Sequence, residues 1–316
     1  MRIFTNPNYN FIKWRWHALV LSALVIGAGI ATMIARGGPP LGVDFEGGTV
    51  IVVRFAQPTG EDPVRRALGP LSAEAVVQQT RGSAGENEIM IRLPQRQGLE
   101  QGASLEADAQ AVKDSLTKAG LPHEVRSTEI VGPVIGQDLK RKGILATLTA
   151  LGGILAYIAL RFRPSFGVGA IVATFHDILV TLVMLTWFNY ELSLNVIAAI
   201  LTITGYSVND TIVVFDRVRE NQRLMRREPL EQIVNKSVNQ TLARTVITAG
   251  ATFQAVVAFY LFGGEVLEGL AFTLLVGIVT GTYSTVFIAA AIAIILSRRS
   301  AGAQAVTQAQ ARAKRV

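Results

Sequence analysis

The sequence contains no cysteine, which excludes disulfide bonds and thiolate metal sites. It has only 3 histidines, and they do not follow a metal-ligand spacing. It also lacks a Gly-x-x-x-x-Gly-Lys-Ser/Thr phosphate loop, and the glycine pairs that begin at Gly47 and Gly152 are not in a strand-loop-helix context. We therefore expect no cofactor, no metal and no enzymatic activity. Any work that the protein performs must then draw on an ion gradient or on ATP hydrolysis by a partner.

Charged residues are scarce at 17%, whereas 50% of the residues are hydrophobic and the mean hydropathy is +0.38. A soluble globular domain rarely has this balance, so the composition favours an integral membrane protein. A helix needs about 20 apolar residues to cross a bilayer. Six runs of about this length predict six transmembrane helices, at residues 18–35, 143–160, 166–188, 193–215, 246–262 and 270–296.

The net charge of +7 is distributed according to membrane topology. Basic residues precede the first apolar run, follow the last one, and occupy the connections after the second and fourth runs. The short connections at residues 189–192 and 263–269 contain none. This is the positive-inside pattern with both termini in the cytoplasm, and it accounts for the basic excess without a nucleic-acid partner.

The first apolar run follows a basic segment, as a signal peptide would, but it is long and no convincing cleavage site follows it. We therefore expect a retained helix. The expected organisation is a cytoplasmic N-terminus at 1–17, a first transmembrane helix at 18–35, a periplasmic domain at 36–142, transmembrane helices two to six at 143–296 and a disordered cytoplasmic tail at 297–316.

The periplasmic segment has the pattern of a small α+β domain. Strands are expected at 43–55, 75–80, 88–93 and 124–131, with one helix from Asp62 to Leu68 and another from Ser104 to Gly120. The order β-α-β-β-α-β is the split, ferredoxin-like motif. The expected fold class is thus an α-helical integral membrane protein with six transmembrane helices and a ferredoxin-like domain between helices 1 and 2.

Asp210 lies deep within the fourth apolar run and is the first functional candidate. A carboxylate at membrane depth costs about 2.5–3.5 kcal/mol on insertion scales, so it needs a partner, a proton or a water-filled cavity. Tyr206 and Ser207 share its helical face and Asn209 borders that face, which makes a small, polar stripe suited to the inside of a bundle. Asp210 is either a protonatable relay or a hydrogen-bonded packing residue, and we favour the relay.

Arg244 is the candidate cation for Asp210, since it stands just before the fifth apolar run. It either pairs with Asp210 or with an acid of another chain, or it is an interfacial arginine that extends to the headgroups. Asp177 in the third run follows His176, but adjacent residues on a helix do not face each other, so a direct pair is not expected and Asp177 is a second relay or packing candidate. Glu268, in the connection 263–269, is expected to be solvated.

Three stretches resemble the SecF members of the SecD/SecF protein-export family, within the resistance-nodulation-division (RND) superfamily: GVDFEGGT at 42–49, LTITGYSVNDTIVVFDRVREN at 201–221 and LARTVITAG at 242–250. The resemblance implies half of an RND-type bundle in the bacterial cytoplasmic membrane, with SecD supplying the other half. It implies a role beside the SecYEG channel, and possible contact with YajC and YidC, in completing translocation of unfolded preprotein with the proton-motive force. It also implies that Asp210 and Arg244 are proton-path residues.

Two other functions stay open from the residues. One is an RND-type half-transporter for small molecules or lipids, against which the single small outer domain argues. The other is a subunit that stabilises a channel without moving protons. In each case the polar face of the fourth helix would be unpaired in lipid, so we expect an obligate membrane partner against it.

Overall fold

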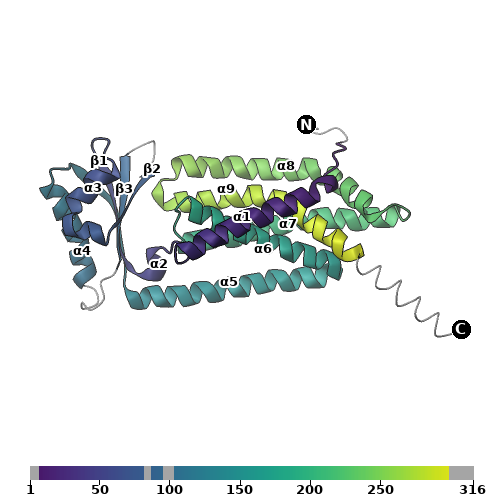
Figure 1. Ribbon diagram of the computed structural model, residues 1–316, viewed down its shortest axis with the longest axis horizontal. Helices are drawn as coiled ribbons and strands as arrows, with labels where there is room; N and C mark the ends of the chain where they lie inside the picture. Colours follow the sequence, from purple (N-terminus) through teal and green to yellow (C-terminus); the bar gives the residue numbers. More distant parts are fainter. Residues whose placement is uncertain (1–6, 82–86, 95–102, 299–316) are drawn as a thin grey trace.

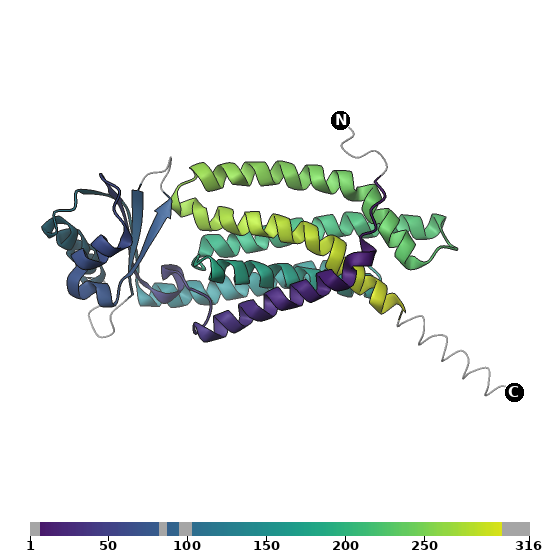
Figure 2. The ribbon, with the colours of Figure 1, turned by 45° about the horizontal axis from the view of Figure 1, so that its top comes forward.

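The structure is a computed structural model that describes residues 7–81, 87–94 and 103–298. A small sheet domain lies at one end of a long helical bundle (Figure 1). Helix α1 starts at the far end of the bundle and runs towards the sheet domain, and the last helix finishes at that same far end (Figures 1 and 2). Most of the expected tail, residues 299–316, and residues 1–6 lie outside the described residues.

Six helices in the described part of the chain are long and apolar enough to cross a membrane, which confirms the expected fold class. Several extend well beyond the apolar runs, because a helix continues into polar sequence until a proline, a glycine or a turn stops it. Their bounds are α1 Arg15–Ala35, α5 Pro133–Arg161, α6 Pro164–Trp187, α7 Leu194–Leu224, α8 Leu230–Phe262 and α9 Glu265–Ser284, with the short helix η1 (Ile12–Trp14) before α1. After α9 the sixth span continues through the π-helical turn η4 (Thr285–Ala289) and remains helical to Arg298.

Helix α6 and the last span, Leu267–Arg298, lie at the centre of the bundle, where 56% and 61% of their most apolar segments are buried. Helices α1, α5 and α8 lie at its edge, with 17%, 11% and 17% buried. Glycines allow the closest helix contacts. A Cβ at Gly277 of α9 would lie 2.2 Å from Ile203 of α7, and a Cβ at Gly29 of α1 would lie 2.1 Å from Val183 of α6. Small residues at such crossings are the usual way in which membrane helices pack.

The sheet domain contains four antiparallel strands in the order β2-β3-β1-β4, which is the expected ferredoxin-like arrangement. The first strand begins later than expected, because Gly47 and Gly48 have φ angles of 75° and 126° and separate a helical turn from the strand. The elements are α2 Val43–Glu46, β1 Gly48–Phe55, α3 Glu61–Leu68, η2 Gly69–Ala73, β2 Val76–Arg81, β3 Asn87–Pro94, α4 Ala103–Lys118 and β4 His123–Val131.

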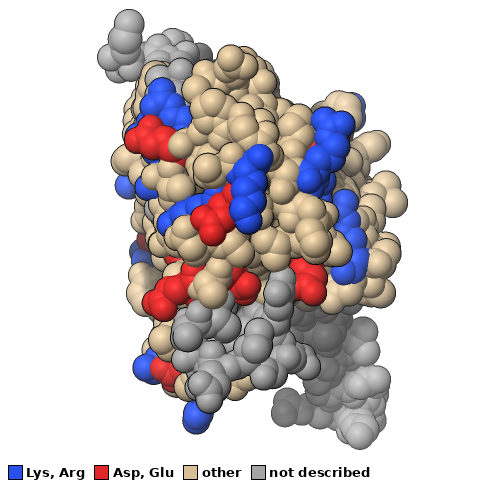
Figure 3. All heavy atoms as spheres, turned by 90° about the vertical axis from the view of Figure 1, so that its left-hand side faces the viewer, with Lys and Arg blue, Asp and Glu red and all other residues tan. Residues whose placement is uncertain are grey.

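Helices α3 and α4 cover one face of this sheet. Their buried side chains, such as Leu68 and Leu116, meet Ile51, Ile89 and Ile91 of the central strands in one apolar core. The outward end of the domain carries basic and acidic side chains side by side (Figure 3). This mixed charge is typical of a solvated surface and does not form the continuous basic patch that nucleic-acid binding would need.

Candidate functional site

Asp210 is half-buried on α7 and contacts α8. Its Oδ1 accepts a hydrogen bond of 2.7 Å from the hydroxyl of Thr245. Among the described residues, neither its buried Oδ2 nor the buried hydroxyl of Tyr206, on the preceding turn, has a hydrogen-bond partner. A buried carboxylate oxygen without a donor is costly, and a bound proton or a donor from a partner chain would remove that cost.

Arg244 directly precedes Thr245 on α8, and its side chain is exposed. Arg244 therefore lies on α8, the helix that contacts Asp210 through Thr245. Within the described residues, no ion pair of 4.0 Å or less joins the Arg244 guanidinium to the Asp210 carboxylate. The expected pairing between them stays a prediction. Thr245, which makes the direct contact, was not singled out from the sequence, although its place in the LARTVITAG stretch was a signal for it.

Asp177 of α6 is 2% exposed and forms a second polar cluster at the centre of the bundle. Its Oδ2 accepts hydrogen bonds from Ser207 of α7 at 2.6 Å and from Ser284 of α9 at 2.8 Å. The cluster therefore uses Ser207, predicted as a neighbour of Asp210, to join three helices. A fully bonded carboxylate of this kind stabilises the packing, whereas one oxygen of Asp210 has no hydrogen-bond donor within the part of the chain that the structure describes.

The expectation that His176 and Asp177 would not pair is wrong. His176 Nδ1 lies 3.0 Å from Asp177 Oδ1, and its Nε2 lies 2.9 Å from the hydroxyl of Ser22 on α1. The Cβ atoms of adjacent residues point apart on a helix. His Nδ1 and Asp Oδ1 are each only two bonds from Cβ, however, so these two atoms can still come within hydrogen-bond distance. Ser22 also lies 3.1 Å from the hydroxyl of Tyr283, so the cluster extends to α1 and α9.

Asn209 is exposed and lies on a stripe of small and polar residues that faces out of the bundle. This stripe continues onto the neighbouring helix α8. Its exposed members are Thr202, Gly205 and Asn209 on α7 and Arg244, Thr248, Ala251 and Ala255 on α8. Lipid tails offer such a surface neither hydrogen bonds nor a close fit, whereas another helix offers both.

The segment between α1 and the sheet contacts the loop that leads into α7. Gly42 N donates to Leu192 O at 2.8 Å, and Leu192 N donates to Pro40 O at 2.7 Å. In addition, the backbone N–H of Leu194, the first residue of α7, donates to Asp44 Oδ2 at 2.8 Å. The sheet domain therefore holds the N-terminus of the helix that carries Asp210, where an acid is favoured by the helix dipole.

Arg92 of β3 strengthens this joint from the sheet side. Its guanidinium donates to Leu41 O at 2.5 Å and lies 3.5 Å from Glu191 and 3.3 Å from Glu46. Burial raises the pKa of the Glu191 carboxyl, and the charge of Arg92 opposes that shift. Arg92 thus stabilises the ionised form of Glu191 at this joint.

Two acidic residues near the ends of the helices make fixed contacts. Glu268 is not solvated in an outer loop as expected, because α9 already begins at Glu265 and Glu268 accepts a hydrogen bond of 2.7 Å from Tyr190. Asp216, at the other end of the bundle, forms an ion pair of 2.7 Å with Arg161 that joins α7 to α5.

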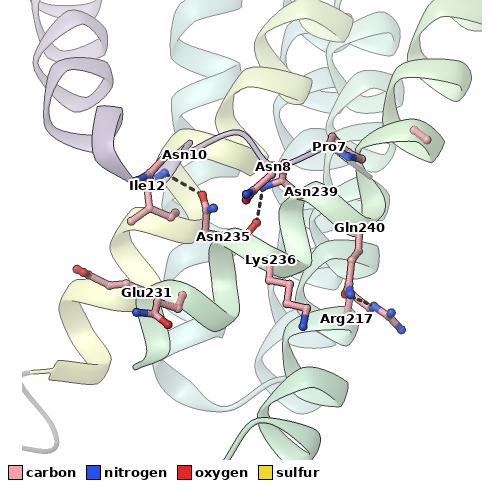
Figure 4. Close-up of a pocket in the computed structure, with 12 residues that line it drawn as sticks. Pro7, Asn8, Asn10, Ile12, Arg217, Glu231, Asn235, Lys236, Asn239 and Gln240 are labelled. Atoms are coloured by element: carbon pink, nitrogen blue, oxygen red, sulfur yellow. Dashed lines mark hydrogen bonds between the residues drawn. The ribbon is translucent and has the colours of Figure 1, made fainter. Parts of the chain in front are cut away.

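A polar pocket of about 820 Å³ lies at that other end, between α8 and the start of the chain. Asn239 bonds the backbone of Tyr9 in both directions at 2.8 Å, and Asn235 Oδ1 accepts from Ile12 N at 3.4 Å. Figure 4 shows these asparagines between the N-terminal stretch and Arg217 with Gln240, which are joined at 2.7 Å. These hydrogen bonds attach the stretch that precedes α1 to α8.

Comparison with known proteins places this geometry in a family. Residues 111–299 match the family described as "Protein export membrane protein SecD/SecF, C-terminal", and residues 33–59 match the "SecD/SecF GG Motif". The chain belongs to the SecD/SecF protein export family. The second match covers the segment that reaches α7 through Asp44, so the family motif coincides with the joint between the sheet domain and the bundle.

Relatives in this family cover almost the whole chain. It is 41% identical to "Protein translocase subunit SecF" of Rhodothermus marinus, over 95% of this chain and 97% of the relative, and 38% identical to the SecF of Escherichia coli O157:H7, over 92% and 88%. In the crystal structure of SecDF from Thermus thermophilus, described as a translocon-associated membrane protein, the match has a TM-score of 0.81 and 34% identity. It covers 93% of this chain but only 39% of the SecDF chain.

Proposed function

We propose that the chain is a SecF-type auxiliary subunit of the Sec protein translocase, which uses the proton-motive force to help preprotein cross the membrane. The names of its relatives support the translocase role. The observation that carries the use of a proton gradient is Asp210, a half-buried intramembrane acid with one oxygen bonded to Thr245 and the other unbonded among the described residues. Intramembrane acids usually mark ion or proton paths.

The joint at the start of α7 supports a mechanical use of that proton. Protonation of Asp210 from the outer side removes its charge and weakens its attraction to Arg244. Helix α7 then changes its position, and the change reaches the sheet domain through the contact between Leu194 and Asp44. Release of the proton inside resets the bundle. One proton that crosses 100 mV supplies about 2.3 kcal/mol to this cycle.

The partner that completes the bundle is SecD, because this chain aligns with only 39% of the SecDF chain and leaves a polar stripe uncovered on α7 and α8. The SecYEG channel, YajC, YidC and the unfolded preprotein are further partners in this proposal. The protein then lies in the bacterial cytoplasmic membrane with both termini in the cytoplasm, as the positive-inside charge distribution indicates.

Gly205 tests the proposed interface with SecD. A Cβ at this position meets nothing within 4 Å among the described residues, so we expect Gly205→Leu to leave the fold of the subunit intact. The larger side chain obstructs a close helix contact, and we expect copurification with SecD to fall about fivefold or more. Gly153→Leu is the matched control, since its Cβ is equally free but lies on α5, away from the stripe. Equal copurification of the two variants would place SecD elsewhere.

Depletion of the chain tests the function as a whole. We expect preprotein to accumulate in depleted cells, and inverted membrane vesicles from them to lose the part of preprotein import that a proton gradient stimulates. Accumulation of a small solute in place of preprotein would favour an exporter. Unchanged gradient stimulation with a weakened channel would favour a purely structural subunit.

A further inference from the structure

A second pocket, of about 860 Å³, lies at the end of the bundle away from the sheet domain. It opens between the hairpin that joins α5 to α6 and the turn that joins α7 to α8, both of which are at the right-hand end of Figure 1. We call it the arginine pocket, because its lining includes Arg161, Arg163, Arg219, Arg223 and Arg226.

Within the described residues, the positive charge of this pocket is not balanced by acidic side chains. Asp216 neutralises Arg161, and Glu228 is the one carboxylate in the lining. No ion pair within the described residues involves Arg163, Arg219 or Arg223.

The floor of the pocket is aromatic. Phe162 and Phe166 both pack edge-on against Phe215, with ring centroids 5.8 Å and 5.1 Å apart. Leu160 lines the rim with 90% of its surface exposed. Because it ends an apolar span and directly precedes Arg161, we expect this leucine at the edge of the hydrocarbon region, where acyl chains meet the headgroups. A ligand for the pocket would therefore combine an anion with a hydrocarbon tail.

We propose that the arginine pocket binds an anionic phospholipid. Its phosphate oxygens accept hydrogen bonds from Arg163, Arg219 and Arg223, and its acyl chains lie against Leu160. Planar guanidinium groups match phosphate oxygens in a two-point geometry, and basic pockets between membrane helices are suited to anionic headgroups. The bound lipid would join the α5–α6 hairpin to the α7–α8 turn. The inference goes beyond the proposed function and requires only that the chain spans a membrane.

The test is a lipid titration of the full-length chain, purified in detergent with any subunit that copurifies and analysed by native mass spectrometry. Separate titrations use short-chain phosphatidylglycerol, short-chain phosphatidylcholine and inorganic phosphate. We expect phosphatidylglycerol to bind at least about tenfold more tightly than phosphatidylcholine, since each arginine near the headgroup favours the anionic lipid. Inorganic phosphate should not compete at equal concentration. Similar binding of both lipids, or effective competition by phosphate, would overturn the proposal.

Two variants of equal charge separate a specific site from general attraction to a basic surface. Arg163→Gln, Arg219→Gln and Arg223→Gln combined should weaken phosphatidylglycerol binding about tenfold or more. The control combines Lys13→Gln, Arg227→Gln and Lys236→Gln, which are exposed at the same end but outside the arginine pocket, and it should change the affinity less than about threefold. Equal losses would show diffuse attraction only. If the triple variant fails to fold, Arg219→Gln and Arg223→Gln are measured singly, and no loss in either would contradict the site.

Discussion

Asp210→Asn is expected to abolish the stimulation of export by a proton gradient while assembly stays normal. Asparagine keeps the shape of the side chain, and its amide oxygen still accepts the hydrogen bond from Thr245. It cannot bind and release a proton, so the gradient no longer acts on α7. Since about 2.3 kcal/mol is available per proton at 100 mV, the lost stimulation is up to about fiftyfold for each proton used.

The measurement compares preprotein import into inverted vesicles with and without a proton gradient, for the wild-type and variant complexes. Asp216→Asn is the control, because it changes another acid of α7 that is ion-paired to Arg161 at the end of the bundle. A partly exposed ion pair of this kind contributes about 0–1 kcal/mol, so the control should keep its gradient stimulation. Full stimulation in Asp210→Asn would show that Asp210 is a packing residue.

The sequence predicted the spans well because length and hydropathy decide which segments cross a membrane. It predicted their ends poorly. The apolar run at 270–296 says nothing about Glu265, yet α9 begins there, because Gly264 with a φ angle of 71° completes the turn after α8. Polar residues at the end of a helix can lie in the headgroup region without a cost in free energy. The residue at which such a helix begins therefore depends on local turns rather than on hydropathy.

The candidate site was predictable only in part for a related reason. Asp210 and Asp177 stand out because an acid in an apolar run is rare, and that signal is local. Their partners come from elsewhere in the chain. Thr245 contacts Asp210 from another helix, and Ser284 is 107 positions away from Asp177. No periodicity within one helix reports which neighbouring helix it faces, so these contacts had to come from the structure.

The contact between Asp44 and α7 was not indicated by the sequence, since its partners are 150 positions apart. This contact also allows the proton site and the sheet domain to have separate roles. The proton site and the sheet domain need not touch, because α7 carries Asp210 and is bonded to the sheet domain at its first residue. A rigid helix with two such contacts can transmit a displacement, provided that both contacts bias its position.

Asp44→Ala should therefore uncouple the proton site from the sheet domain. The backbone N–H of Leu194 loses its acceptor and the helix start loses an acid, which together cost about 1–2 kcal/mol. We expect amide hydrogen exchange at residues 192–194 to accelerate about 5- to 30-fold in the purified complex. Gradient-stimulated import should fall as far as in Asp210→Asn, because the ionisable site is intact but no longer moves the domain.

Two further variants decide whether the hydrogen bond is the cause. Asp44→Asn keeps an oxygen that accepts from Leu194 N, so it should retain most of the import and most of the protection from exchange. Glu46→Ala removes a neighbouring acid of α2 that pairs with Arg92 at 3.3 Å, and it should leave both readouts nearly unchanged. If Asp44→Ala accelerates exchange without reducing gradient-stimulated import, α7 reaches the sheet domain by another route. If it changes neither readout, the contact is incidental and the coupling between α7 and the domain does not exist.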